Sequence, residues 1–327
     1  MKNSGRLVVV NIVLLAFLNP AAWGADDVRD WLKKMQHAAH MVNYDGTFVY
    51  SQEEQLSAMR LIHRANKDGE QERLISLDST GREVIRDNKK VTCILPDSKA
   101  VVVEKGRPAG KFPPPFPSSI RDLEKYYKFS LANQEKVAGQ LAQEIIIQPR
   151  DEYRYGHRLW VDVNTGLLLQ KHLLNETGKP LEKFMFTQIQ YLQHVPDDLL
   201  KSQSIGKEYT WYETDDKEPM SSMQDKKHYH WQVAWLPAGF KQDMQREHKL
   251  PSNGKQLEHM LFSDGLSSIS VFIEPQSDKD SHLDGGSSMG AVSAHGKRVD
   301  GFHITVVGEV PQIAVRKVCR SVSKKDE

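Results

Sequence analysis

The sequence predicts an α+β protein, in which a large antiparallel sheet with helices on one face precedes a smaller second unit. Three observations support this fold class. Short segments with many alternating polar and apolar residues follow one another between residues 47 and 192. Turn-forming Gly, Asn and Asp residues separate these segments. A polar stretch over residues 196–230, poor in aliphatic side chains, divides them from the remaining part of the chain.

The N-terminus has the pattern of a secretory signal peptide. A basic start is followed by the apolar run Leu7–Leu18 and by a small-x-small site at Ala22–Gly24. The run is shorter than the ~20 residues that span a bilayer, so an uncleaved anchor is the weaker alternative. A bacterial lipoprotein needs a Cys at the cleavage site, and this sequence has none there, so that class is excluded. We expect residues 1–24 to be removed and the mature chain to begin at Ala25.

The first element of the mature chain is a predicted amphipathic helix over Asp26–Val42. Its apolar residues recur at helical spacing, which is typical of a face packed on a core. They are Val28, Trp31, Leu32, Met35, Ala38, Ala39 and Val42. An acidic residue at the start can cap the helix.

A meander of strands is predicted next, because alternating segments are separated by turn signals such as Lys67-Asp68-Gly69. The alternation is imperfect, which indicates a sheet covered in part on both faces. The predicted strands are Thr47–Gln52, Ser57–Asn66, Glu70–Asp78, Arg82–Asp87, Lys90–Leu95 and Ala100–Glu104.

The proline-rich segment Lys111–Pro117 interrupts this sheet. Proline donates no ladder hydrogen bond, so the segment predicts a stiff, extended loop. It carries Phe112 and Phe116, which we expect to be exposed. Two interpretations stay open: the rings pack onto their own domain, or they bind a ligand.

Beyond this loop, Ser119 and Asp122 form a capping-box pattern that predicts a helix through Tyr127. Strands then resume at about Lys136. The stretch Gly156–Gln190 predicts three strands in succession, because Asn and Gly residues at its two joints supply the positive φ of hairpin turns.

The polar stretch after the sheet predicts a linker, with a single strand at Tyr209–Tyr212 as an option. Beyond it, Trp231–Val322 predicts a second antiparallel unit that ends in the helix Pro311–Ser323. The expected strands of this unit are Phe240–His248, Gln256–Ser263, Ser267–Glu274, Met289–Lys297 and Phe302–Gly308.

Composition limits the classes of partner and compartment. The formal net charge is +1, and removal of Lys2 and Arg6 with the signal peptide makes it −1, which argues against general nucleic-acid binding. The two cysteines, Cys93 and Cys319, do not form a disulfide scaffold. Two small buried residues are the simplest interpretation, and a disulfide within one chain or between two is the alternative.

Catalytic and metal-binding motifs are absent from the sequence. Gly286–Gly290 fits the form G-x-S-x-G around Ser288, but a polar loop precedes it and a strand is predicted after it. We therefore interpret it as a chance match in a flexible loop. The pairs His37/His40 and His228/His230 lack further ligands at metal-binding spacing. The sequence predicts no enzyme, no cofactor and no metal.

Four short motifs resemble those of the RseB/MucB family, periplasmic regulators of envelope-stress sigma factors. They are Gly81–Val84, Trp235–Phe240, Phe262–Leu266 and Val306–Pro311. Their order and spacing extend the resemblance over essentially the whole mature chain, from Ala25 to about Ser323.

The resemblance implies a LolA-like antiparallel half-barrel with helices on its concave face, enclosing an apolar cavity, followed by a linker and a smaller C-terminal sheet domain with a terminal helix. The expected boundaries are 25–200 for the lipid-sensing domain, 201–228 for the linker and 229–327 for the C-terminal domain. A cavity of this kind can hold acyl chains, and burial of a fourteen-carbon chain contributes about 10 kcal/mol.

The resemblance also implies a role in the periplasm. The chain is expected to bind the periplasmic domain of a RseA/MucA-like anti-sigma factor and to shield it from site-one proteolysis. Lipopolysaccharide or another acylated ligand is expected to loosen that complex. A second copy of the chain stays open as a partner. The alternatives are a periplasmic lipid or lipoprotein carrier and a hydrolase that uses Ser288.

Candidate binding residues follow from these expectations. The proline loop lies between the two halves of the sheet, where a flap over a half-barrel is expected, and basic residues beside it suit lipid phosphates. The candidate lipid-binding residues are Lys105, Arg107, Lys111, Phe112 and Phe116. The candidate partner-binding residues in the C-terminal domain are Trp235, Leu236 and Phe240, with core packing as the alternative for Trp235.

Overall fold

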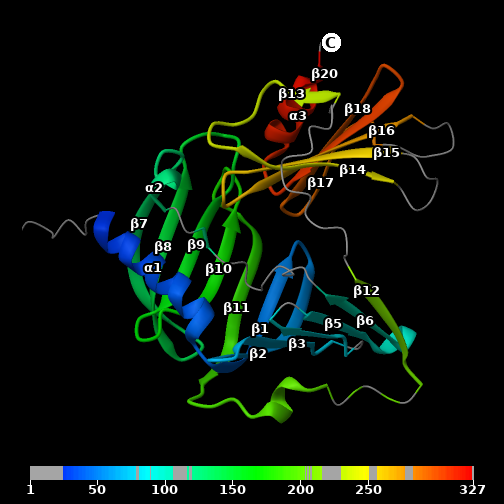
Figure 1. Cartoon of the computed structure of the whole chain (residues 1–327). Helices are drawn as coiled ribbons and strands as arrows, with labels where there is room; N and C mark the ends of the chain where they lie inside the picture. Colours follow the sequence, from blue (N-terminus) through cyan, green and yellow to red (C-terminus); the bar gives the residue numbers. More distant parts are fainter. Residues whose placement is uncertain are drawn as a thin grey trace, which may run out of the picture.

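Over the residues that it describes, the computed structural model contains a 12-stranded sheet, a six-stranded sheet, the two-stranded sheet β13-β20 and three α-helices (Figure 1). The described residues are 25–78, 81–88, 90–105, 116–117, 120–202, 204, 206, 208–215, 230–249, 256–276 and 283–325. The expected signal peptide lies outside them. Within the described residues, no helix combines the length and the apolar character needed to cross a membrane.

The N-terminal part is a 12-stranded sheet in the order β12-β6-β5-β4-β3-β2-β1-β11-β10-β9-β8-β7. Its elements are α1 (Ala25–Met41), β1 (Tyr44–Gln52), β2 (Gln55–Asn66), β3 (Gly69–Ser76), β4 (Glu83–Asp87), β5 (Lys90–Leu95), β6 (Ala100–Lys105), α2 (Ile120–Leu123), β7 (Tyr127–Val137), β8 (Gln140–Pro149), β9 (Gly156–Asp162), β10 (Leu168–Leu174), β11 (Pro180–Tyr191) and β12 (Thr210–Asp215). Two meanders, β1–β6 and β7–β11, are joined by antiparallel pairing of β1 with β11.

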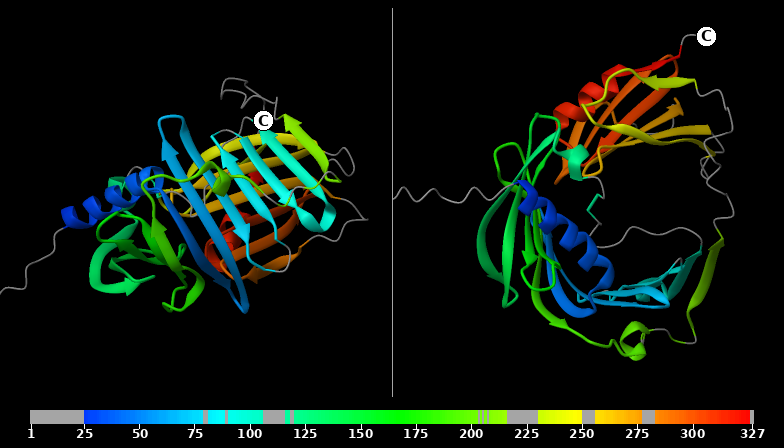
Figure 2. Two further views of the ribbon diagram at one scale, coloured as in Figure 1. Left: turned by 90° about the horizontal axis from the view of Figure 1, so that it is seen from below. Right: turned by 60° about the vertical axis from the view of Figure 1, so that its left-hand side comes forward.

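The sheet is an open half-barrel, because β7 and β12 form its two edges and do not pair with each other. It curves around α1, which lies on the concave side in Figure 2 and contacts both β7 and β2. The apolar stripe of α1, with Val28, Leu32 and Met35, packs with Ile120 and Leu123 of α2 against β7–β9. The predicted fold class is therefore confirmed, including helices on the concave face.

The segment after β11 returns across the sheet to its opposite edge. Val195 and Leu200 pack with Ile62 of β2 in a small apolar cluster. The short 3-10 helix η2 (Asp197–Leu200) contacts β3 there. The strand β12 then pairs in parallel with β6, so part of the stretch predicted as a linker belongs to the sheet, at the site of the optional strand.

The return segment is held by a buried ion pair. Arg73 Nε donates to Glu83 Oε2 at 2.9 Å, and their side chains are only 10% and 2% exposed. The same pair binds the segment that crosses it: Arg73 donates to the Leu199 carbonyl at 3.1 Å, and Ser204 donates to Glu83 at 2.8 Å. Because both charges are used by the crossing segment, its path is specified by polar contacts as well as by apolar packing.

The C-terminal part consists of a six-stranded sheet in the order β14-β15-β16-β19-β18-β17, with a helix packed on one face. Its elements are β13 (Trp231–Val233), β14 (Lys241–Lys249), β15 (Gln256–Ser263), β16 (Ser268–Pro275), β17 (Gly285–Met289), β18 (Val292–Val299), β19 (Phe302–Gly308), α3 (Gln312–Ser321) and β20 (Val322–Lys324). The buried face of α3, with Ala314, Val318 and Cys319, packs on inward residues such as Val271 and Val306.

Three local predictions are wrong. The capping-box helix does not extend through Tyr127: α2 ends at Leu123, and Tyr127 already begins β7, because pairing with β8 supplies more hydrogen bonds than a short helix. Strands therefore resume at Tyr127 instead of Lys136. The segment Gly285–Met289, expected as a flexible loop, is the strand β17.

Both cysteines are free, so the alternative of a disulfide within the chain is excluded in this structure. Cys319 is fully buried in the C-terminal core, and Cys93 is half-buried in β5. Burial raises the pKa of the Cys319 thiol to about 11, which keeps it protonated and inert at neutral pH.

Two histidines in the N-terminal sheet are held neutral by burial. The pKa of His172 is lowered to about 4, first by burial and then by Lys183 and Arg158. The His172 ring contacts the Trp160 ring in an edge-to-face arrangement, with 4.7 Å between the two ring centroids. The pKa of His157 is lowered well below its usual range by burial and by Lys171, and its Nε2 atom has no hydrogen-bond partner.

We expect these histidines to make the fold acid-sensitive. Their pKa values in the folded state lie below the unfolded value of about 6.5, so the unfolded chain takes up protons first as the pH falls. Their contribution to stability is complete above pH ~6.5 and is lost as the pH falls, in the case of His172 over the range down to about 4. Urea unfolding as a function of pH measures this slope. His157→Gln should flatten it and the exposed His37→Gln should not; equal slopes in both variants would contradict the assignment.

Candidate functional site

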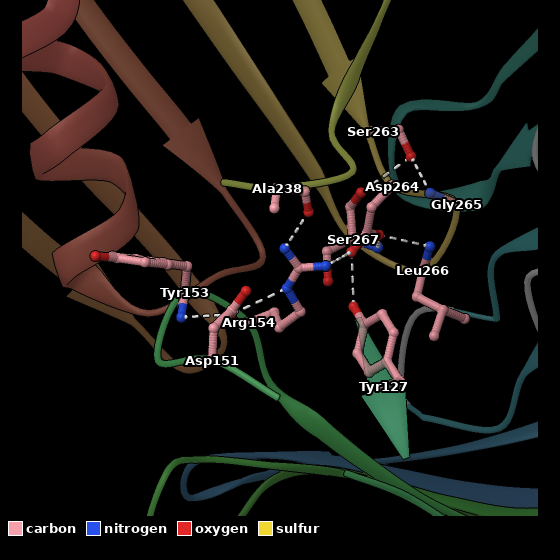
Figure 3. A network of polar contacts seen from close by, with 10 residues as sticks. All are labelled: Tyr127, Asp151, Tyr153, Arg154, Ala238, Ser263, Asp264, Gly265, Leu266 and Ser267. Carbon is pink, nitrogen blue, oxygen red and sulfur yellow. Dashed lines mark hydrogen bonds and ion pairs between the residues drawn. The ribbon is translucent and has the colours of Figure 1, made fainter. Parts of the chain in front are cut away.

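The two sheets meet at a network of buried polar groups around Arg154, in the loop between β8 and β9 (Figure 3). The Arg154 side chain has no exposed surface, and all three of its nitrogens donate. Nη1 donates to Asp264 at 2.9 Å and Nη2 donates to the Ala238 carbonyl at 2.6 Å, both in the C-terminal part. Nε donates to Asp151 at 3.1 Å within the same loop. One guanidinium thus joins the two domains.

Asp264 is equally enclosed. Its side chain has no exposed surface, and Oδ2 accepts from Arg154 and from the Tyr127 hydroxyl, the latter at 2.8 Å. Oδ1 accepts from the backbone N–H groups of Leu266 and Ser267 at 2.9 and 2.8 Å. Burial and the Asp264 charge raise the pKa of Tyr127, so its hydroxyl stays protonated as a donor. Both charges are fully hydrogen-bonded, as buried ions require.

Aromatic rings and close backbone contacts complete the junction. The Arg154 guanidinium lies 5.2 Å from the ring centre of Tyr126 and 5.4 Å from that of Phe240, on opposite sides of the junction. Gly239 and Gly265 have positive φ of 93° and 98°. A Cβ at Gly239 would lie 2.3 Å from the Tyr126 ring, so glycine is needed for the approach of the two domains as well as for the turn.

The predicted partner-binding residues lie at or beside this junction. Phe240 is buried in the C-terminal core. Trp235 and Leu236 pack against that core from its edge. The Trp235 ring also meets Tyr153 of the N-terminal domain edge-on at 5.0 Å, and Lys317 lies 4.1 Å above it. Phe240 is thus a core residue, whereas Trp235 and Leu236 are half-buried at the edge of the C-terminal core.

A second contact between the domains lies at the β17–β18 turn. Ala291 packs with Tyr155 and Leu173 in an apolar cluster, and the Gly290 N–H donates to Glu53 at the β1–β2 turn. A cavity of about 380 Å³ opens beside this cluster. Its lining comes from both domains and includes Tyr155, Glu176, Leu181, Ser293, Pro311 and Ile313.

Charges also face each other across this second contact. Burial lowers the pKa of Lys171 in β10, and two nearby carboxylates, Glu309 of the C-terminal domain and Glu182 of β11, oppose this effect. Burial raises the pKa of Glu182, which accepts a hydrogen bond from Tyr50.

Of the predicted lipid-binding residues, only Phe116 has a described side chain. Lys105 ends β6, and Arg107, Lys111 and Phe112 lie outside the described residues. The expectation of an exposed ring is wrong for Phe116, which is half-buried and packs against the cluster that α1 forms with β7–β9. Gln36 of α1 binds the backbone carbonyls of Phe116 and Pro117.

The structure brings together no nucleophile and base at Ser288. Its hydroxyl donates to the Gln312 side chain at 3.0 Å, and a turn and the strand β18 follow it, where an elbow needs a helix. Among the described residues, no three His, Cys, Asp or Glu side chains gather as a metal site requires. His40 instead contacts Glu70, with 2.9 Å between the ring and the carboxylate.

The structure defines a class of two-domain protein in which an open half-barrel is joined to a sheet-and-helix domain by a buried ion pair. The chain belongs to the MucB/RseB family. The model of the MucB/RseB N-terminal domain matches residues 27–204, and that of the MucB/RseB C-terminal domain matches residues 225–323.

Named relatives and solved structures agree with this assignment. The chain is 31% identical to the sigma factor AlgU regulatory protein MucB of Pseudomonas aeruginosa, over 97% of both chains. It is 25% identical to the sigma-E factor regulatory protein RseB of Salmonella typhimurium, over 89% of both. The crystal structure of MucB in complex with MucA(peri) is similar with a TM-score of 0.72 and 30% identity, over 92% of this chain and 100% of that chain.

Sequence reasoning missed the residues that form the junction. Asp264 lies inside the motif Phe262–Leu266, which was used only for the resemblance. Arg154 lies in a polar loop with no motif, 110 residues from its partner, and no local pattern reports such a contact. The one available signal was the dense polar sequence Arg150–Arg158 between two apolar strands, which is unusual for a short connection.

We expect Arg154 and Asp264 to be strongly coupled. Arg154→Met should lower the free energy of unfolding by about 3–5 kcal/mol, because it leaves a carboxylate buried without its cation. Asp264→Asn should have a similar effect, and the double variant should lose less than the sum. Urea unfolding measures all three, with Arg82→Met in the exposed Arg82–Asp97 pair as a control that changes little. Additive losses would show that the two charges do not depend on each other.

Proposed function

We propose that this chain is a periplasmic regulator that binds the periplasmic region of a membrane anti-sigma factor. In this proposal it shields that region from site-one proteolysis and releases it when a lipid-like signal such as lipopolysaccharide binds. It has no enzymatic activity. In this proposal the lipid-sensing half-barrel spans residues 25–200, residues 201–228 link the domains and add β12 to the half-barrel, and the anti-sigma-binding domain spans residues 229–327.

One observation carries this proposal: the likeness to MucB bound to MucA(peri) covers both domains together, with 92% of this chain superposed on all of that chain. A second complex structure, of Pseudomonas aeruginosa MucA/MucB, has a TM-score of 0.73 over the same share. A partner that needs both domains needs them in a fixed arrangement, and the Arg154–Asp264 junction provides such an arrangement.

A periplasmic lipid or lipoprotein carrier is the second candidate. The open half-barrel favours it, because a curved sheet can hold acyl chains without any catalytic residue. A carrier needs only that sheet. In this chain a second domain is attached through a fully desolvated ion pair. A carrier function does not account for this second domain.

The two functions predict different partners. The mature chain, tagged at its C-terminus, should retain a single-span anti-sigma factor from a periplasm and membrane extract, whereas a carrier should retain a set of outer-membrane lipoproteins. In a second assay, the purified anti-sigma periplasmic region is incubated with the site-one protease. Saturating amounts of this chain should slow cleavage, and lipopolysaccharide should restore it. Cleavage at an unchanged rate would refute the shielding role.

The proline loop offers a test of the lipid site that separates its two rings. Phe112→Ser should lower the affinity for lipopolysaccharide and leave the thermal midpoint unchanged, if this ring contacts lipid. Phe116→Ser should lower the thermal midpoint by several degrees, because its ring packs on the α1 cluster. Lys111→Gln should weaken binding more at low than at high salt. Unaltered lipid affinity in both Phe112→Ser and Lys111→Gln would exclude the loop from the lipid site.

A further inference from the structure

A small hollow of about 320 Å³ lies in the C-terminal domain, between the β17–β18 hairpin and α3. Its lining residues are Gly286, Ser287, Ser288, His295, Gln312 and Arg316. Gly286 pairs with His295 and Ser288 with Ser293 across the hairpin, which brings Ser288 and His295 to the same face of the sheet. The hollow is separate from the Arg154 network and contains none of its residues.

The lining consists of hydrogen-bonding groups without a carboxylate. Within the described part of the chain, the Arg316 side chain forms no ion pair or hydrogen bond. The His295 Nδ1 atom is buried and has no hydrogen-bond partner. A buried polar atom without a partner costs about 1–3 kcal/mol, so a ligand that pairs with it gains this energy on binding.

The local field is positive. The pKa of His295 is lowered first by burial and then by Arg320 and Arg316, while Asp284 opposes them with a smaller effect. Both arginines belong to α3, and their charges lie close enough to act on this ring. The hollow also includes the first residue of α3, a ten-residue helix without a side-chain cap. The Ala314 N–H of this first turn already donates to the Pro311 carbonyl at 2.8 Å, so the binding of an anion depends on the side chains.

Gly286 keeps the hollow open. A Cβ at this position would lie 2.2 Å from Gln312 Nε2 and 3.5 Å from His295 Nδ1, so any side chain would fill the space that these groups enclose. Gln312 forms the wall, because its amide already donates to the Ala294 carbonyl and accepts from Ser288. The groups left for a ligand are the Arg316 guanidinium and the His295 ring.

We propose that this hollow binds a phosphate-class anion, either inorganic phosphate or a phosphomonoester. Arg316 supplies the charge and two parallel donors, a geometry that suits phosphate oxygens. His295 pairs with a further oxygen. The cavity at the domain contact shares Ser288 and Gln312 with the hollow, so the organic part of a phosphomonoester has space beside the anion.

The test uses the full mature chain and inorganic phosphate. Imidazole signals are followed by carbon–proton NMR at constant ionic strength, and the signal that disappears in His295→Gln identifies His295. Millimolar phosphate should shift this signal to saturation, and Arg316→Gln should weaken binding about tenfold or more. Arg298→Gln is the matched control, because this exposed arginine lies on β18 with the opposite orientation to His295.

The outcomes separate binding from a structural role and identify the source of the anion. Arg316 is exposed, so Arg316→Gln should keep the thermal midpoint. Cosedimentation with phosphatidic acid vesicles but not with phosphatidylcholine vesicles, lost in Arg316→Gln, supports a lipid headgroup. The NMR shift without cosedimentation supports a soluble phosphate. No shift at His295, or the same affinity in Arg316→Gln as in the unsubstituted chain, overturns the proposal.

Discussion

The ion pair between Arg154 and Asp264 is the interaction on which the arrangement of the two domains depends. Removing two charges from water costs several kcal/mol for each ion, and the cost is recovered only with complete hydrogen bonding. Here every nitrogen of the guanidinium donates, and both carboxylate oxygens accept. A rotation of one domain against the other would separate Arg154 from Asp264 and from the Ala238 carbonyl. The pair therefore specifies orientation, and its contribution to net stability is secondary.

The four motifs that carry the resemblance all lie where parts of the chain are joined. Glu83 in the first motif binds Arg73 and the segment that returns across the sheet. The second motif supplies the carbonyl that accepts from Arg154, and the third supplies Asp264. The fourth contains Glu309, which faces Lys171 across the second contact. The resemblance thus reflects how the parts are connected more than it reflects any single surface.

Much of the fold could be predicted from the sequence, because alternation and turn residues are local signals. They placed β2–β6 and β14–β16 within a few residues. The errors have physical causes. The residues Gly285–Met289 show no apolar alternation, and they become a strand only because β18 supplies a partner. At Tyr127 a capping pattern competed with alternation at Phe129 and Leu131, and pairing with β8 decided the outcome. The junction between the domains could not be predicted, because Arg154 and Asp264 are brought together by the fold and not by their spacing in the sequence.

The proposed lipid signal requires a route from the half-barrel to the surface that binds the partner, because a ligand shifts an equilibrium only through its differential affinity for the two states. The described end of the proline loop, Phe116 and Pro117, lies between the half-barrel and the C-terminal domain. A Cβ at Gly265 would be only 3.2 Å from Pro117 Cγ, so the loop packs directly against the residue that follows Asp264. Displacement of Pro117 would remove packing from the turn that holds the buried carboxylate. A lipid that moves this loop would therefore act directly on the turn beside the Arg154–Asp264 pair, which is one of the two contacts between the domains.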